Sequence, residues 1–262
     1  DGANIIGIHM EGPFFSDEYK GAQNPDFLQY GSIENLDKLI GNHWDILKIF
    51  TFAPERVDEE VIQKLKDKNV IAAMGHTGAD NALVEKSNLL GASHVVHLYN
   101  GMKGLHHREP GTAGAVLSND KIYAELILDG IHVHPKMAEI AYKCKGDKLI
   151  LITDSMKAAG LQDGKYDLGG QDVFVQGSEA RLANGSLAGS TLTMNNAFKN
   201  ALKYLSSNII DVVKLTSTNA ANELNLSSKG KIEVGRDADL VVLSKEYNIE
   251  KVIKGGKLII SK

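Results

Sequence analysis

Short apolar runs recur along the first part of the chain, and each is followed by a more polar stretch. The runs are rich in Ile and Val and almost continuously apolar, which is typical of parallel strands covered on both faces. They occupy residues 5–10, 46–52, 70–74, 93–98, 122–128 and 149–153. Between them, apolar side chains recur at helical spacing over residues 57–68, 81–90 and 135–145. This alternation predicts an α/β fold with a parallel sheet.

The pattern changes after residue 154. Residues 157–185 are rich in Gly, Asp and Gln with short alternating runs, which predicts an irregular or hairpin insertion. Two further helices are predicted over 195–206 and 212–224. The tail predicts short strands at 240–243, 252–253 and 258–260, with a hairpin turn at Gly255-Gly256. We therefore predict an α/β body over residues 1–234 and a small β extension over residues 235–262.

The length and composition limit the folds and the binding partners that the chain can have. The chain has 262 residues, and a single (β/α)-barrel typically needs about 250. Apolar residues make up 43% and charged residues 24%, with a formal net charge of −4. A nucleic-acid partner would normally bring a basic excess, so we expect none. A small anionic ligand stays possible, because a few local cations suffice to bind one.

The cysteine content and the apolar runs indicate in which cellular compartment the protein is expected. Cys144 is the single cysteine, so an intrachain disulfide is impossible and a reducing, cytoplasmic location is expected. No stretch approaches the roughly 18 apolar residues of a membrane span, and we expect no membrane association. The sequence lacks an initiating Met and opens as if cut from a longer chain.

Chemically active side chains stand where the apolar runs end. Glu11 follows the first run, His76 the third, His97 the fourth and Asp154 the last. In parallel α/β folds, and in barrels above all, the carboxyl ends of the strands carry the active site. Taken singly, each position has a plain structural explanation, since an Asp after a strand often only caps a helix. Four such positions at the ends of different strands predict a common site.

The residue types are those of a catalytic metal site. Two imidazoles and one carboxylate form a three-ligand set that leaves positions open for water. Nitrogen and oxygen donors suit Zn²⁺ or Fe²⁺ and do not choose between them. Such an ion lowers the pKa of bound water from about 16 toward about 7. Asp154 could then take the proton from that water and return it to a leaving group.

Two further segments are candidates for ligand contacts. Gly101 would let the backbone approach an anion closely, and Arg108 presents a planar fork suited to phosphate or carboxylate. The alternative is a surface loop with incidental charge. His132, in a stretch that begins at Asp129 after another apolar run, could donate to an anion or to a sugar hydroxyl.

Taken together, these motifs resemble the N-acetylglucosamine-6-phosphate deacetylase family of the amidohydrolase superfamily. The resemblance covers essentially the whole chain and is carried by the segments His9–Phe14, Gly75–Thr77, His97–Met102, Arg108–Gly111, Asp129–His132, Ile152–Asp154, Leu187–Met194 and Gly235–Val241. The segment Gly235–Val241 is shared widely among amidohydrolases, whereas the first six are specific as a set.

The resemblance implies a role for each matching position. Glu11, His76 and His97 become metal ligands, and Asp154 becomes the catalytic acid/base. The implied substrate contacts are Ala22, Gln23, Asn100, Gly101, Arg108, His132, Leu187, Ala188 and Gly189. Among these, Asn100, Gly101 and Arg108 would hold the 6-phosphate.

The resemblance also implies a fold, a reaction and an assembly. The fold is a (β/α)₈ TIM-type barrel with a small β-sandwich domain, and the first strands of the barrel are missing from this chain. The reaction is hydrolysis of N-acetyl-D-glucosamine 6-phosphate to D-glucosamine 6-phosphate and acetate, in amino-sugar catabolism and cell-wall recycling. The expected assembly is a homodimer in which the neighbouring subunit helps to bind phosphate.

Some features depart from the family pattern. Some relatives have His where this chain has Gln23, and Asn-Ala is common at the Asn100-Gly101 position. Many members carry a His-x-His pair on the first barrel strand, so one or two ions remain possible.

Two alternative functions are another amidohydrolase, dihydroorotase-like or dipeptidase-like, and a catalytically incomplete fragment that acts as a binding module.

Overall fold

A curled parallel sheet of six strands forms the centre of the protein in the computed structural model, which describes residues 2–261. The strands are β1 (Ile8–Glu11), β2 (Leu47–Phe52), β3 (Ile71–Met74), β4 (Ala92–Val95), β5 (Tyr123–Ile127) and β6 (Leu149–Ile152). They lie side by side in chain order, and every neighbouring pair is parallel. The six predicted strands are thus confirmed, and their carboxyl ends meet on one edge. The arrangement is that of a partial TIM-like barrel.

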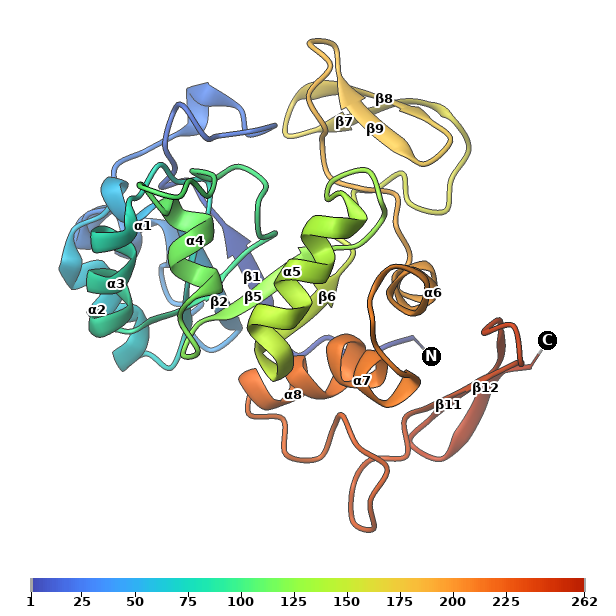
Figure 1. Cartoon of the computed structure of the whole chain (residues 1–262). Helices are drawn as coiled ribbons and strands as arrows, with labels where there is room; N and C mark the ends of the chain where they lie inside the picture. Colours follow the sequence, from blue (N-terminus) through green and yellow to red (C-terminus); the bar gives the residue numbers. More distant parts are fainter. Residues whose placement is uncertain (1, 262) are drawn as a thin grey trace.

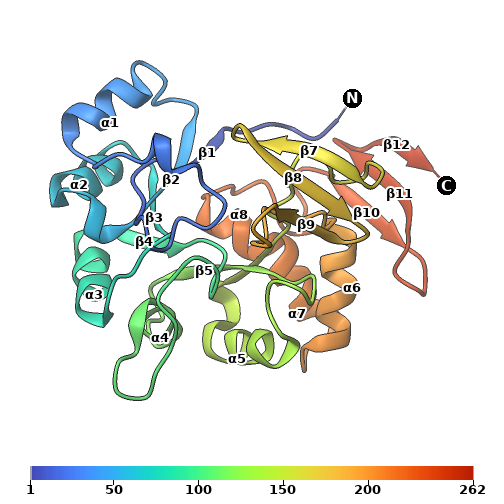
Figure 2. The same cartoon turned by 90° about the horizontal axis from the view of Figure 1, so that it is seen from above.

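Helices cover the outer side of this sheet (Figures 1 and 2). They are α1 (Ile33–Ile40), α2 (Glu59–Asp67), α3 (Asn81–Leu90), α4 (Gly111–Leu117) and α5 (Pro135–Lys145). Each packs against the helix that follows it. The predictions for α2, α3 and α5 are confirmed, whereas α1 and α4 are absent from the elements predicted above.

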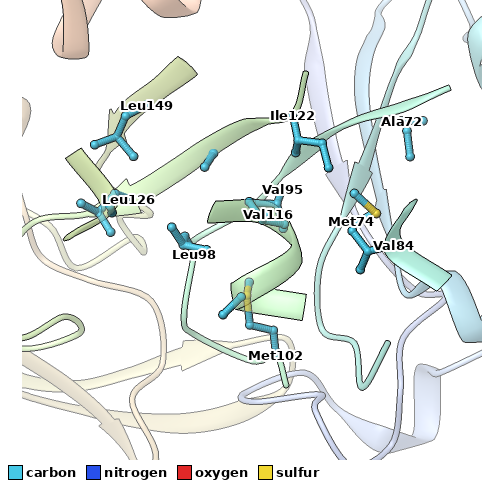
Figure 3. Packing of buried hydrophobic residues seen from close by; sticks show 14 of the residues in the cluster. Ala72, Met74, Val84, Val95, Leu98, Met102, Val116, Ile122, Leu126 and Leu149 are labelled. Carbon is cyan, nitrogen blue, oxygen red and sulfur yellow. The ribbon is translucent and has the colours of Figure 1, made fainter. Parts of the chain in front are cut away.

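The main hydrophobic core lies between the sheet and these helices. Figure 3 shows strand residues such as Met74 and Leu126 facing helix residues such as Val84 and Val116. All four are fully buried, and burying such a side chain stabilises a fold by about 1.5–3 kcal/mol. Strands and helices are thereby fixed together, so the loops that follow the strands start from a rigid base.

The predicted insertion is a separate antiparallel sheet. Its strands are β7 (Gly164–Leu168), β8 (Gln171–Gln176) and β9 (Glu179–Leu182), with β8 in the middle. We call it the insert sheet. It lies near the carboxyl ends of the barrel strands (Figure 1) and has a small core of its own around Val173 and Val175. The prediction of hairpin structure in this region is confirmed.

Three helices and a second antiparallel sheet complete the chain. The helices are α6 (Met194–Tyr204), α7 (Ile209–Val213) and α8 (Asn219–Glu223), and the strands are β10 (Leu240–Leu243), β11 (Ile249–Lys254) and β12 (Lys257–Ser261). A wide π-helical turn at Lys214–Thr218 joins α7 to α8, so the segment predicted as one helix is two helices joined by that turn. The turn at Gly255-Gly256 has φ of 54° and 78°, as the predicted hairpin requires.

The C-terminal sheet is attached to the body through α6. The ring of Tyr247 lies 5.9 Å from that of Phe198, and the ammonium of Lys199 donates to the Asn248 side chain at 2.6 Å. Among residues 2–261, no helix combines the length and the apolar composition needed to cross a bilayer.

Candidate active site

Three of the predicted residues converge at the carboxyl edge of the parallel sheet. Glu11 is the last residue of β1, while His76 and His97 each stand two residues beyond their strands, β3 and β4. Oε1 of Glu11 lies 3.0 Å from Nε2 of His76 and 2.8 Å from Nε2 of His97. One donor atom from each residue fits within 4.8 Å, a spacing suited to one metal ion. We call this set the metal cluster.

Backbone carbonyls orient both imidazoles. Nδ1 of His76 donates to the carbonyl of Tyr19 at 2.8 Å, and Nδ1 of His97 donates to the carbonyl of Asn100 at 3.1 Å. In a neutral imidazole this places the proton on Nδ1 and leaves the lone pair on Nε2, the atom that faces Glu11. Metal-binding histidines are usually held in this way by a second acceptor. The residues therefore fit a divalent cation.

The charges of the metal cluster are strongly coupled. Burial acts to raise the pKa of Glu11, but the hydrogen bonds from His76 and His97 outweigh it and hold that pKa well below its usual value. Burial likewise acts to lower the pKa of His97, and the Glu11 carboxylate overcomes this and raises it to about 9. The carboxylate is thus held in its ionised form, which is the form that binds a cation.

Unusual backbone geometry marks the same positions. The φ angles are 49° at His76, 28° at His97 and 47° at Asp154. Positive φ is uncommon outside glycine and costs about 1 kcal/mol or more, and such residues cluster at functional sites. Here the strained turns redirect the chain just after each strand, so the side chains face one another across the sheet edge.

Asp154 lies beside the metal cluster and lines the same pocket. Burial raises the pKa of its carboxyl to about 6, against the opposing effect of His97. Its backbone is fixed because its carbonyl accepts from the amide of Ser190 at 2.8 Å. Within residues 2–261 its carboxylate makes no hydrogen bond, so both oxygens are available to a water or a substrate.

A pocket of about 690 Å³ opens above these four residues. Most of the predicted contact residues line it, namely Ala22, Gln23, Asn100, Gly101, His132, Leu187 and Gly189. They lie in the loops that follow the parallel strands, including the loop after β1, and in the segment that follows the insert sheet. The volume falls within the usual range for small-molecule sites.

His132 has a fixed orientation in this pocket. Its Nδ1 donates to the Asp129 carboxylate at 2.6 Å, and that carboxylate also accepts from the amides of Ile131 and His132. Burial acts to raise the pKa of Asp129, yet these hydrogen bonds lower it. Because Nδ1 is committed, Nε2 is the atom of His132 that a ligand can reach.

Gly101 has a steric role in addition to its predicted contact with an anion. It has a φ of 56°, and a Cβ built there would stand 2.9 Å from Nδ1 of His76. A side chain at this position would therefore collide with the ring of a metal-cluster residue. The amide of Asn100 is already donated to the carbonyl of His97, so Gly101 offers the better-placed amide for an anion.

Two predicted contact residues do not line the pocket. Arg108 lies on an exposed loop, where its guanidinium contacts the ring of His107 at 2.8 Å. Ala188 is fully buried, and its amide pairs with the carbonyl of Ala180 in the insert sheet. Within this chain, Arg108 is therefore separated from the metal cluster, whereas Ala188 supports its neighbours Leu187 and Gly189.

A second group of ionisable residues was not predicted. His94 on β4 has its Nδ1 2.6 Å from Glu223 of α8 and its Nε2 3.0 Å from Glu125 of β5. We call these three residues the buried ion-pair cluster. Burial acts to lower the pKa of His94, but the two carboxylates raise it to about 10. The strand pattern gave no sign of this cluster, because Glu223 comes from a distant helix.

Comparison with known proteins identifies the family. Residues 5–259 match the amidohydrolase family. The chain belongs to the amidohydrolase family. It is 45% identical to the N-acetylglucosamine-6-phosphate deacetylase of Bacillus subtilis (strain 168) over 260 residues, which is 98% of this chain and 66% of that protein. It is 36% identical to the N-acetylgalactosamine-6-phosphate deacetylase of Escherichia coli O157:H7 over 259 residues, which is 98% of this chain and 69% of that protein.

A solved structure shows that the similarity extends from the sequence to the fold of this chain. It is a mutant N-acetyl-D-glucosamine-6-phosphate deacetylase from Mycobacterium smegmatis in complex with N-acetyl-D-glucosamine-6-phosphate. It matches with a TM-score of 0.93 at 33% identity and covers 97% of this chain and 68% of that one. The chain thus spans about two thirds of the length of the relatives it matches, and the resemblance inferred from its motifs is confirmed.

Proposed function

We propose that this chain forms most of an enzyme that hydrolyses N-acetyl-D-glucosamine 6-phosphate to D-glucosamine 6-phosphate and acetate. The observation that carries the proposal is the placement of Asp154 beside the metal cluster in one pocket. The similarity to sugar-phosphate deacetylases supports the substrate class.

The donor atoms of Glu11, His76 and His97 would hold Zn²⁺ or Fe²⁺, and a bound ion of this kind supplies an acidified water and polarises a carbonyl. Residues 2–261 offer one such cluster. A second ion, if the protein uses one, would need donors from outside these residues.

The chain's own residues account for the proton transfers. Asp154 accepts a proton from the attacking water, whose oxygen forms a bond to the acetyl carbonyl carbon. The bond between that carbon and the sugar nitrogen then breaks, and Asp154 returns the proton to the departing amine. Nε2 of His132 is held toward the pocket by Asp129. In the neutral ring this atom is suited to accept from a sugar hydroxyl, and in the doubly protonated ring to donate to the acetyl oxygen.

Phosphate binding is proposed to involve two subunits. The amide of Gly101 lies in the pocket, whereas Arg108 lies outside it on an exposed loop. We infer a homodimer in which Arg108 contacts the phosphate bound by the neighbouring subunit. A phosphorylated sugar does not cross membranes unaided because of its charge, so we place the reaction in the cytoplasm.

The finer architecture belongs to the same proposal. The six parallel strands would be part of a (β/α)₈ barrel, and the sheet β10–β11–β12 would be one part of a small β-sandwich domain. Residues 1–234 and 235–262 would then divide between these two domains.

A deacetylation assay tests the function. The protein that contains this chain is stripped of metal, reloaded with Zn²⁺ or Fe²⁺, and assayed for acetate release from N-acetylglucosamine 6-phosphate. We expect activity to vanish on stripping and return on reloading. The absence of acetate release from the loaded protein would contradict the proposal.

A second candidate substrate is N-acetylgalactosamine 6-phosphate, because a relative named for that activity is 36% identical. The two sugars differ only in the orientation of one hydroxyl group. Measuring kcat/KM for both with the same metal-loaded protein decides between them, and we expect the glucosamine compound to give the higher value.

Mixed dimers test the position of Arg108. Neither Arg108→Ala nor Asp154→Asn should be active alone at a low substrate concentration. A mixture of the two contains dimers with one intact phosphate site and one intact acid/base in the same pocket. Partial recovery of activity in the mixture would support contact between subunits, and no recovery would place Arg108 within its own subunit's site.

A further inference from the structure

The insert sheet presents one face to the active site. Along β8, Val173 and Val175 are buried while Phe174 is half exposed, which is the alternation of a strand covered on one side. The buried face packs with Met156, which follows Asp154 closely in the chain, and with Ala22 from the loop after β1. Leu168 and Gly169, at the end of β7, line the pocket. The insert sheet therefore forms one wall of the pocket.

A second part of the pocket lining is the loop over residues 16–24, which we call the strap and which contacts the insert sheet through Ala22. It lines the pocket through Gly21, Ala22, Gln23 and Asn24. The strap is tied to a metal-cluster residue at two places, because the Tyr19 carbonyl accepts from Nδ1 of His76 and the Ser16 amide donates to the His76 carbonyl at 3.0 Å. These two bonds hold the strap at residues 16–19 independently of the insert sheet, so residues 20–24 can loosen while His76 keeps its support.

One side chain joins these two walls. Nε2 of Gln171 donates to the carbonyl of Ala22 at 2.6 Å. Gln171 pairs with Leu168 at the end of the β7–β8 hairpin, and the turn between them is Gly169-Gly170 with φ of 60° and 80°. Such a two-residue turn fixes the register of a hairpin, so the Gln171 side chain is held at the tip nearest the strap.

We propose that Gln171 is a positioning residue that latches the strap to the insert sheet and keeps the pocket closed around the phosphorylated sugar. This inference rests on the proposed function for the identity of the ligand. The latch acts through the strap, and Gln171 itself does not touch the reacting atoms. Because it stabilises the closed pocket, it contributes to substrate retention more than to the chemical step.

Three substitutions isolate the latch. Gln171→Glu keeps the size of the side chain but replaces the donor with a carboxylate, and Gln171→Ala removes the side chain. Gln176→Ala is the matched control, because Gln176 lies on the same strand, is exposed and faces the other way. A hydrogen bond contributes about 1 kcal/mol net, which corresponds to roughly a fivefold change. We expect KM to rise about fivefold in both Gln171 variants, with kcat within twofold and the control unchanged.

Hydrogen exchange of the strap amides gives a readout that does not depend on the substrate. Both Gln171 variants should exchange residues 20–24 about fivefold faster than the parent protein, with the melting temperature retained. Unchanged exchange in Gln171→Glu would overturn the latch whatever the substrate is. A loss in kcat with KM unchanged would overturn it as well. Faster exchange in a protein that does not deacetylate the sugar phosphate would leave the latch standing and reject only the proposed function.

Discussion

The chain contains two clusters of histidine and carboxylate residues, whose histidines are His94 on β4 and His97 two residues beyond its end. In the metal cluster, His97 gives Nδ1 to a neutral backbone carbonyl and turns Nε2 toward Glu11. In the buried ion-pair cluster, His94 has a carboxylate at each nitrogen, Glu223 at 2.6 Å and Glu125 at 3.0 Å. The first histidine lines an open pocket, whereas the side chain of the second is 1% exposed.

The contrast shows what separates a histidine suited to bind a metal from a structural one. Glu11 favours a proton on Nε2 of His97 while no metal is bound, but Nδ1 faces only a neutral carbonyl. A cation therefore has to displace one proton to gain the lone pair of Nε2. Two flanking carboxylates instead hold both protons on the ring, so His94 is an imidazolium that has no lone pair to offer. Its role is to connect β4, β5 and α8 through buried charges.

The largest effect should follow the loss of Asp154, the proposed proton carrier next to the metal cluster. Asp154→Asn keeps the shape and tolerates the φ of 47°, since Asn is among the residues most often found there. It cannot exchange a proton, and general acid–base catalysis contributes about 10²–10⁴-fold. We expect kcat to fall by about 10³-fold with metal content unchanged, measured by steady-state kinetics and elemental analysis. Normal turnover would remove Asp154 from the reaction.

Matched substitutions in the two clusters should separate metal binding from stability. His97→Gln should lose most of the bound metal. His94→Gln should retain it but lose about 3 kcal/mol of unfolding free energy, because breaking a buried ion pair leaves an uncompensated charge. Metal titration and urea unfolding measure both quantities for both variants. If His94→Gln also lost its metal, the distinction between the clusters would fail.

The contribution of His94 to the unfolding free energy should depend on pH. The pKa of His94 is raised to about 10 in the folded protein, against an unfolded value near 6.5. Its ion pairs therefore stabilise the fold fully below about pH 6.5, and this contribution declines as pH rises toward 10. The stability gap between the parent protein and His94→Gln, measured by urea unfolding at fixed metal concentration, should narrow from pH 6.5 to 10. A constant gap would mean that His94 carries no buried charge.

The smallest effect concerns an extension of the buried ion-pair cluster. Nε2 of His9 lies 2.6 Å from the hydroxyl of Thr51, and Nδ1 of His9 lies 4.0 Å from Glu125. Thr51→Val keeps the volume but leaves the ring nitrogen without this partner, which should cost about 1 kcal/mol. Unfolding in urea measures the loss. Thr216→Val is the control, because within residues 2–261 that hydroxyl bonds to carbonyls of its own helical turn alone.

Sequence pattern could predict the metal cluster because each of its residues stands at or within two residues of the end of an apolar run that forms a strand. Once the strands are parallel and consecutive, their ends must meet, so Glu11, His76, His97 and Asp154 are brought together by topology alone. The helix α4 escaped prediction for a physical reason. Its seven residues are all buried, so no polar face marks a helical period.

The buried ion-pair cluster and the hydrogen bond from Gln171 to the strap escaped prediction for another reason. Both depend on contacts between residues far apart in the chain, such as His94 with Glu223 and Gln171 with Ala22. Loops carry no periodic pattern, and a single glutamate on a helix gives no sign that it enters a sheet interior. Such pairings follow from the packed fold and cannot be inferred from local sequence.

The left-handed backbone at His76, His97 and Asp154 has a consequence for how this protein can change. The two histidine rings hold the Glu11 carboxylate, so removing either would cost more than the strain it relieves. The Asp154 carboxylate makes no hydrogen bond within residues 2–261, so Asp154→Gly should raise the melting temperature of the metal-free protein while abolishing activity. A mutant library screened for heat resistance alone would therefore enrich inactive members at position 154.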